Sequence, residues 1–239
     1  MSGANKAPTT PFDGIGLSRD SLARGEVMKL ARERDGATTS ILTEEALLAS
    51  RRAVLPDDYK GDDIWVFGYG SLIWKPEIAY DERRDATVHG FHRRFCMWTR
   101  IGRGSPDCPG LVLALDNGGS TKGVIFRIPA AIAPRELDIL WRREMMADSY
   151  RPVWLTTRTN QGPIKALSFA IRRNRPVFAP RMSDAQTARI IYKAKGFVGP
   201  CKDYLANTQK ALIAAGIYDK QMTKLASLVQ KMDEEAPSR

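Results

Sequence analysis

The fold is decided by Ile64-Trp-Val-Phe-Gly-Tyr-Gly-Ser-Leu-Ile-Trp74, an apolar, strand-like run that ends in two glycines flanking a tyrosine. Gly68 and Gly70 permit backbone angles that other residues avoid, and they let a ligand approach the main chain. Successive amides in such a turn can face an anion or a developing oxyanion. Taken alone, a Gly-x-Gly turn after a strand is more often a tight bend than a site. The segment is therefore a candidate active-site loop that needs partners from elsewhere in the chain.

Length and composition favour one cytoplasmic domain with an appendage. The chain has 239 residues, of which 43% are hydrophobic, enough for a sizeable core. No apolar stretch approaches the roughly 18 to 20 residues that span a bilayer, and residues 1–10 lack the pattern of a signal peptide. The cysteines are odd in number and widely spaced, which indicates a reducing compartment without a disulfide framework: Cys96, Cys108 and Cys201.

The net charge of +10 raises the question of a nucleic-acid partner, because clustered basic residues attract phosphates. No helix-turn-helix, zinc-finger or RNA-binding signature accompanies the charge. We therefore expect no nucleic-acid partner and no membrane partner. A positive field would instead raise the encounter rate with a small anionic substrate. The basic pairs are scattered over different expected elements: Arg83-Arg84, Arg93-Arg94, Arg142-Arg143 and Arg172-Arg173.

Three segments are expected along the chain. Residues 1–62 form an N-terminal helical extension and linker, in which a Gly, Ser, Pro and Thr-rich tail precedes one helix over residues 18–34 and another capped by Thr43. Residues 63–232 form the main domain, and residues 233–239 form a C-terminal tail. We expect the extension to pack on the domain or on a partner, without contributing chemistry.

Strand patterns come first in the main domain and helical patterns last, which predicts an α+β domain. Asn117-Gly118-Gly119 separates two apolar runs and predicts a hairpin over residues 111–128. A second hairpin is predicted over residues 151–171. Ser183 and Gln186 form a capping-box pattern, and a helix is predicted over residues 201–215 before Gly216.

Glu144 is the candidate catalytic carboxylate. Pro134 is typical of a helix start, and the apolar face of that helix is formed by Leu137, Leu140, Trp141 and Glu144. A carboxylate on this face must be paired, protonated or functional, because burying it alone costs several kcal/mol. The structural alternative is an ion pair with Arg93 or Arg94. On the opposite face, Asp138 and Arg142 are expected to form a solvent-exposed i, i+4 pair.

The order of motifs resembles the ChaC-like, glutathione-specific branch of the γ-glutamylcyclotransferases. The resemblance runs from residue 64 to the last helix, and it implies a γ-glutamylcyclotransferase-like mixed, barrel-like β-sheet with flanking helices. It also implies that the glycine loop binds the γ-glutamyl group and that Glu144 is the base. The motifs are Phe67-Gly-Tyr-Gly-Ser-Leu72, Arg93-Arg94-Phe95, Pro109-Gly110, Trp141-Arg-Arg-Glu-Met145, Gly199-Pro200 and Tyr204-Leu205.

The resemblance implies that glutathione is cleaved to 5-oxoproline and Cys-Gly. The substrate's own α-amine attacks its γ-carbonyl, so the reaction needs no enzyme nucleophile, metal or cofactor. Glu144 would take the proton of the α-ammonium and return it to the leaving nitrogen. Loop amides would stabilise the oxyanion or bind the glutamyl carboxylate. The expected substrate-binding residues are Val66, Phe67, Gly68, Tyr69, Gly70, Ser71, Leu72 and Tyr204. Tyr150 is a weaker candidate for contact with the substrate than Tyr204.

Other kinds of site fit the sequence poorly. Ile73 stands where a dinucleotide-binding motif needs its third glycine. His89 and His92 have no second ligand pair for zinc. Cys96 is four residues from His92, about 13 Å along a strand, too far for a thiol-imidazole pair.

Two alternatives to the glutathione enzyme stay open. One is a cyclotransferase for other γ-glutamyl peptides or amines, and the other is a catalytically inactive binding module on the same fold. Leu72 follows the ChaC-like pattern and favours glutathione, whereas Glu144 favours an enzyme over an inactive copy. The sequence leaves the oligomeric state open.

Overall fold

Five strands in the described part of the chain close into a β-barrel with the strand order β1-β3-β2-β4-β5. The computed structural model describes residues 17–35 and 41–235. β5 closes the barrel through parallel pairing with both β1 and β3, so the sheet is mixed as expected. The barrel strands are β1 (Ile64–Gly68), β2 (Glu82–Thr99), β3 (Gly110–Ile128), β4 (Tyr150–Thr159) and β5 (Gly162–Ile171).

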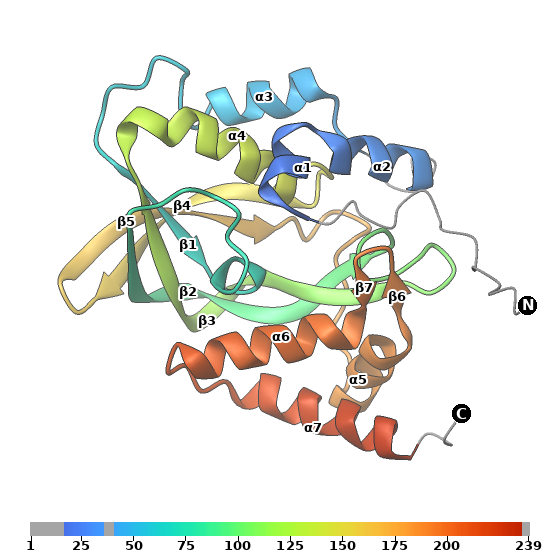
Figure 1. Ribbon diagram of the computed structural model, residues 1–239. Helices are drawn as coiled ribbons and strands as arrows, with labels where there is room; N and C mark the ends of the chain where they lie inside the picture. The colour runs from blue at the N-terminus through green and yellow to red at the C-terminus, as the bar shows by residue number, and fades with distance from the viewer. Residues whose placement is uncertain (1–16, 36–40, 236–239) are drawn as a thin grey trace, which may run out of the picture.

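Helices flank the barrel on two sides, as Figure 1 shows. α1 (Arg19–Ala23), α2 (Glu26–Asp35), α3 (Glu44–Arg52) and α4 (Ala133–Glu144) lie on one side. α5 (Asp184–Lys193), α6 (Cys201–Ala214) and α7 (Lys220–Glu234) lie on the other. Short elements complete the described fold: the 3-10 turns η1 (Ser71–Ile73) and η2 (Ala130–Ile132), and the small sheet of β6 (Lys195–Gly196) and β7 (Gly199–Pro200).

The hairpin predicted over residues 111–128 is wrong, because this segment is the single strand β3. β3 pairs with β2 from end to end, and the register shifts between His89 and Phe91, opposite the Asn-Gly-Gly motif. Gly90, Gly118 and Gly119 all have positive φ there (84°, 93° and 72°). Glycine in this conformation serves a bulge as well as a hairpin turn. The motif therefore bends a continuous two-stranded ribbon instead of reversing the chain.

Several local predictions are confirmed. β4 and β5 form the second hairpin. The Ser183 capping box and the proline at the start of α4 are present.

The helix predicted over residues 18–34 is instead two helices, because Gly25 adopts a positive φ of 69° between α1 and α2.

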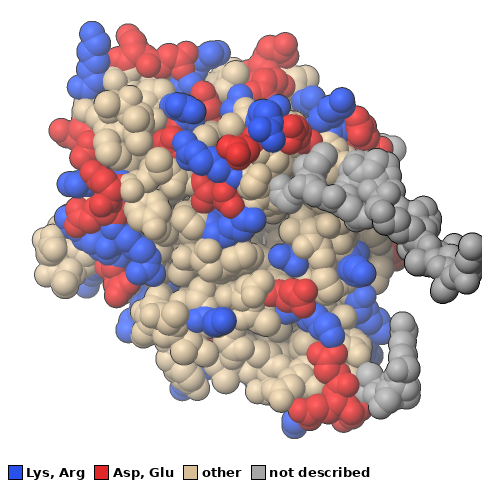
Figure 2. Space-filling model, viewed as in Figure 1, with Lys and Arg blue, Asp and Glu red and all other residues tan. Residues whose placement is uncertain are grey.

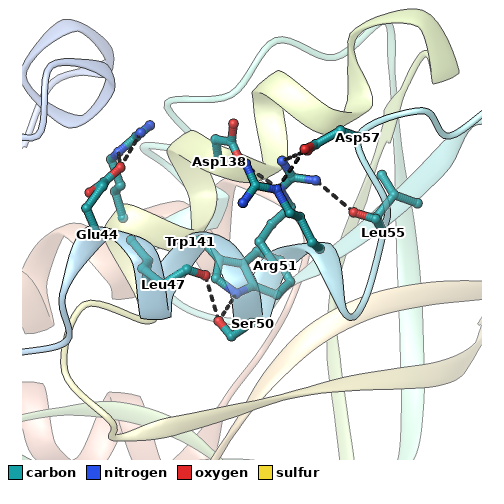
Figure 3. Close-up of polar contacts among 10 residues, drawn as sticks. Glu44, Leu47, Ser50, Arg51, Leu55, Asp57, Asp138 and Trp141 are labelled. Atoms are coloured by element: carbon teal, nitrogen blue, oxygen red, sulfur yellow. Dashed lines mark hydrogen bonds and ion pairs between the residues drawn. The ribbon is translucent and has the colours of Figure 1, made fainter.

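The solvent-exposed pair of Asp138 with Arg142 is also wrong. Both side chains turn to α3, where Arg51 donates to Asp138 Oδ1 at 2.6 Å and Arg142 donates to Glu44. The Trp141 indole donates to Ser50 Oγ at 3.0 Å in the same interface, as seen in Figure 3. Packing against α3 therefore covers the face of α4 that the sequence pattern assigns to water.

Parts of the predicted tails lie outside the described residues, namely residues 1–16 of the N-terminal extension and residues 236–239 of the C-terminal tail. Within the two described ranges, none of the helices has both the length and the apolar character that a bilayer crossing requires. On the face in Figure 2, basic and acidic side chains are interspersed over the N-terminal helices, in keeping with the scattered basic pairs of the sequence.

Candidate active site

A cavity of about 740 Å³ lies where the loop after β1, the end of α4, the start of β4 and the start of α6 meet. Glu144 carries the one carboxylate among the described residues that line this cavity. Its cationic lining residues are Lys75, Arg100, Arg103 and Arg143. The candidate residues that it brings together are Tyr69, Gly70, Ser71, Leu72, Glu144, Tyr150 and Tyr204.

The first three residues of the predicted binding loop lie beside the cavity and are not among its lining residues. Val66, Phe67 and Gly68 belong to β1, and the side chains of Val66 and Phe67 are fully buried in the barrel. The lining begins at Tyr69, where the chain leaves the strand. These three residues therefore hold the start of the loop in the barrel wall.

Gly70 allows a close approach between the loop and α6. A Cβ atom at this position would lie 3.3 Å from Tyr204 Oη and 3.7 Å from Leu113 Cβ. η1 begins at the next residue, and this turn carries Ser71 and Leu72 along the cavity. The absence of a side chain at Gly70 therefore lets the Tyr204 hydroxyl lie close to the loop backbone.

Arg93 fixes the loop from below. Its guanidinium donates to the Tyr69 carbonyl at 2.7 Å and to Asp219 Oδ2 at 2.8 Å, and its side chain is 4% exposed. Arg94 pairs with Asp116 at 3.0 Å. The expected alternative, an ion pair of Glu144 with one of these two arginines, is therefore wrong. The two arginines of this motif support the loop and the barrel.

Glu144 is held by its neighbour Arg143. Arg143 Nε lies 2.9 Å from Glu144 Oε1, and the Glu144 side chain is 14% exposed. Burial raises the pKa of Glu144, and the adjacent guanidinium only partly opposes this rise. Glu144 ends α4, so the carboxylate is carried by a rigid helix.

Arg143 also ties the catalytic candidate to the loop. It donates to Ser71 Oγ at 2.9 Å, to the Pro76 carbonyl at 3.2 Å and to the Lys75 carbonyl. No role was predicted for Arg143 from the basic pair and the motif in which it occurs. Its position beside Glu144 in the Trp141–Met145 motif is the one local signal for this contact.

Three buried tyrosines surround the carboxylate. Burial raises the pKa of Tyr69, Tyr150 and Tyr204, and the negative charge of Glu144 adds to the effect on all three. Tyr69 donates to the Phe169 carbonyl at 3.1 Å, and Tyr150 donates to the Leu113 carbonyl at 3.3 Å. All three hydroxyls therefore stay protonated and uncharged, and those of Tyr69 and Tyr150 already donate to backbone carbonyls. Tyr150, the weaker candidate in the sequence, lines the cavity together with Tyr204.

Two of the cysteines are buried away from the cavity lining. Burial raises the pKa of the Cys96 thiol to about 12 and that of Cys201 to about 11. Cys201 Sγ donates to the Leu111 carbonyl at 3.0 Å. Both thiols therefore stay protonated at neutral pH, and both belong to the hydrophobic core.

Sequence comparison finds curated relatives that are named as γ-glutamylcyclotransferases. The glutathione-specific γ-glutamylcyclotransferase of Escherichia coli (strain K12) is 35% identical over 188 residues, which are 78% of this chain and 80% of that protein. The glutathione-specific γ-glutamylcyclotransferase 1 of Homo sapiens is 32% identical, over 59% of this chain and 66% of its own length.

Structural comparison adds a crystal structure of a γ-glutamylcyclotransferase specific to glutathione from yeast. It has a TM-score of 0.67 and 25% sequence identity, and the match covers 74% of this chain and all of the yeast chain. The family model described as ChaC-like protein matches residues 64–232, which contain the loop, Glu144 and Tyr204. This chain therefore belongs to the ChaC-like protein family.

Proposed function

We propose that this chain is a glutathione-specific γ-glutamylcyclotransferase, which converts glutathione to 5-oxoproline and Cys-Gly with Glu144 as general base and acid. One observation carries the proposal: a single carboxylate, rigidly held at a helix end, lines the same cavity as the glycine loop. The relatives named as glutathione-specific cyclotransferases support the substrate.

The reaction needs one proton acceptor that is also a proton donor. Glu144 takes a proton from the α-ammonium, and the freed amine attacks the γ-carbonyl carbon to form the new carbon–nitrogen bond of the lactam. The amide bond to cysteine then breaks as Glu144 returns the proton to the departing nitrogen. The ring nitrogen loses its second proton to the released amine, so the products are the neutral lactam and an ammonium. A carboxyl group with a raised pKa suits both steps, because its carboxylate is a stronger base than that of an ordinary glutamate and its protonated form is still acidic enough to protonate a leaving amine.

The loop and the tyrosines supply position and charge stabilisation. The amides from Tyr69 to Leu72 either hold the oxyanion that develops on the γ-carbonyl or bind the glutamyl carboxylate. Tyr204 offers a neutral hydroxyl in the same cavity as Glu144, whereas the Tyr150 hydroxyl, whose proton goes to the Leu113 carbonyl, can accept a hydrogen bond. Because the attack is intramolecular, the enzyme gains much of the rate by holding the amine and the carbonyl in the orientation of attack.

The charges of the cavity support a peptide with two carboxylates. Four cationic side chains line the cavity, of which Arg143 is paired with Glu144 and Lys75 with Glu77. Glutathione carries a carboxylate at each end and a net negative charge, so the remaining two cations, Arg100 and Arg103, are suited to it. A γ-glutamyl amine without the second carboxylate would leave part of this field unused.

The test is an assay of the purified protein for 5-oxoproline with glutathione, γ-glutamyl dipeptides and γ-glutamyl amines as substrates. We expect turnover of glutathione, and a loss of about 100-fold or more in kcat for Glu144→Gln. Asp138→Asn, on the same helix but away from the cavity lining, should keep its activity. Turnover by Glu144→Gln equal to that of the parent would remove this residue from the mechanism.

The same assay separates the alternatives. Indifference to the Cys-Gly part would favour a cyclotransferase for other γ-glutamyl peptides or amines. Binding of glutathione without any 5-oxoproline would favour an inactive binding module. A cytoplasmic location is also proposed, and fractionation of the source cells with a specific antibody would test it.

A further inference from the structure

The N-terminal segment supplies part of the active-site wall. Leu17 and Val27 line the cavity, although both lie well before residue 64, where the match to the family model begins. They pack in one small apolar cluster with Leu22, Ile139 and Met146. Ile139 belongs to α4, and Met146 follows Glu144 by two residues. The cluster therefore joins the extension to the helix that carries the catalytic candidate.

A partly buried ion pair anchors this wall at its first helix. The Arg19 guanidinium contacts both carboxylate oxygens of Glu136 at 2.5 Å, and the Glu136 side chain is 2% exposed. The backbone N–H of Arg19 also donates to Glu77 Oε2 at 2.6 Å. Two-point contacts of this kind fix orientation as well as distance. α1 is thus held in one place on α4.

A second anchor lies immediately beyond Glu144. The backbone N–H of Leu42 donates to the Met146 carbonyl at 2.8 Å, and Ile41 forms a β-bridge with Ala147. Met146 and Ala147 are themselves cavity-lining residues. The segment before α3 therefore holds the chain that follows the carboxylate, and α3 clamps α4 through the contacts in Figure 3.

The chemistry of this wall indicates which part of a substrate it meets. Leu17 and Met146 offer only apolar surface, and Val27, which is 1% exposed, packs against them. The glutamyl end of the substrate instead carries an ammonium and a carboxylate that need polar partners. A terminal carboxylate would likewise seek the cations of the cavity. The uncharged side chain of the residue that leaves with the amine is the part of a γ-glutamyl tripeptide that matches an apolar wall.

We propose that Leu17 and Val27 are specificity-determining residues, which limit the space for the side chain of the leaving residue to about the size of cysteine. The inference rests on the proposed function and deepens it. It also gives the N-terminal extension a role in substrate selection, in place of the purely structural one expected from the sequence.

The experiment compares glutathione with S-propylglutathione, whose larger thioether would press on this wall. For Leu17→Ala and Val27→Ala, we expect the ratio of kcat/KM for S-propylglutathione to that for glutathione to rise about 10-fold or more, the effect of one or more methylenes in an apolar pocket. Leu22→Ala is the matched control, because Leu22 is fully buried in the same cluster but is not among the cavity-lining residues. It should lower stability and leave the ratio unchanged.

A ratio that stays within twofold of the parent in both alanine variants would overturn the inference. Leu17→Phe covers the case in which an alanine variant does not fold, since a larger side chain should lower the same ratio. Dissociation constants of the two peptides, measured by calorimetry, report on the wall even without turnover. An absence of 5-oxoproline with the unmodified protein would therefore contradict the proposed function, while the ratio of dissociation constants would still decide on the wall.

Discussion

At the scale of single residues, Glu144 is subject to two opposing influences. Burial disfavours its charged form, and the guanidinium of Arg143 at 2.9 Å favours it. Burial is the larger effect, so the pKa of Glu144 is above that of an ordinary glutamate. Without Arg143, burial would raise the pKa of Glu144 further. Arg143 therefore lowers the pH at which Glu144 becomes a carboxylate.

This balance predicts the pH dependence of the reaction. The base must be deprotonated, so kcat/KM should fall as the pH drops through the raised pKa of Glu144, at a higher pH than for an ordinary glutamate. Arg143→Met removes the favourable charge and should move this acid limb to still higher pH. The measurement is the pH profile of kcat/KM for 5-oxoproline release.

Arg142→Met is the matched control for that profile. Arg142 is the preceding residue, but it pairs with Glu44 of α3 instead of with the catalytic candidate. Its acid limb should coincide with that of the parent. An Arg143→Met profile with an unchanged or lowered acid limb would contradict the assigned role.

The sequence could predict the position of Glu144, because the helical spacing places it on the face of Leu137 and Trp141. It could not predict the partner of this carboxylate. From spacing alone, an arginine of the Arg93-Arg94 pair and the adjacent Arg143 are equally plausible partners. Only the path of the chain after β1 brings Ser71 within reach of Arg143.

At the scale of elements, the contact of the glycine loop with α6 depends on the missing side chain of Gly70. Gly70→Ala would press a methyl group to 3.3 Å from Tyr204 Oη, and we expect a loss of about 1–3 kcal/mol in the free energy of unfolding. Tyr204→Phe removes the crowded oxygen, so the double variant should lose less than the sum of the two single losses. Urea unfolding of the four proteins measures this.

Gly102→Ala gives the control in the same cavity. Its new Cβ would meet only Val198, at an ordinary distance of 3.6 Å, so its stability should stay close to that of the parent. Additive losses in the Gly70 and Tyr204 variants would show that the loss of stability in Gly70→Ala does not come from crowding against the Tyr204 hydroxyl.

The interface of α3 with α4 depends on Arg51, whose side chain is 2% exposed. It donates to Asp138, to the Leu55 carbonyl at 2.7 Å and to Asp57, as Figure 3 shows. Arg51→Met should lower the free energy of unfolding by about 1–3 kcal/mol, because a buried carbonyl loses its donor while both carboxylates can turn to water.

Arg52→Met is the matched comparison, since Arg52 pairs with the same Asp57 but is 52% exposed. Exposed ion pairs contribute little, so its loss should stay within about 1 kcal/mol. Thermal or urea unfolding of both variants gives the difference. Equal losses would mean that the ion pair with Asp57, rather than the buried position of Arg51, stabilises the interface.

Local signals predicted most of the elements, and their failures have a common cause. Proline at the start of α4 and the Ser183 capping box act within one turn of helix, so the sequence contains all that is needed. The Asn117-Gly118-Gly119 motif specifies only a left-handed backbone. Whether that backbone reverses the chain or bends it depends on the partner strand, and here β2 continues past the motif.

At the scale of the whole molecule, the extension and the main domain form one connected structure in the described residues. Arg19 and Glu136 are 117 positions apart in sequence, and no local pattern connects them. The sequence therefore predicted helices in the extension but not their place beside the cavity. The motifs from residue 64 onward predicted the barrel through their resemblance to the ChaC-like family, and the barrel is present. The roles of the site residues that the resemblance implies stay a prediction.

The burial of Cys96 and Cys201 has a consequence for redox chemistry. Exchange with a disulfide requires a thiolate and access to it, and both thiols lack these in the folded protein. The two core thiols are thereby protected from forming mixed disulfides with glutathione. Incubation with oxidised glutathione, followed by peptide mass spectrometry, should find adducts at Cys96 and Cys201 only after denaturation, so any adduct on the folded protein should lie at the partly exposed Cys108 and leave the core unchanged.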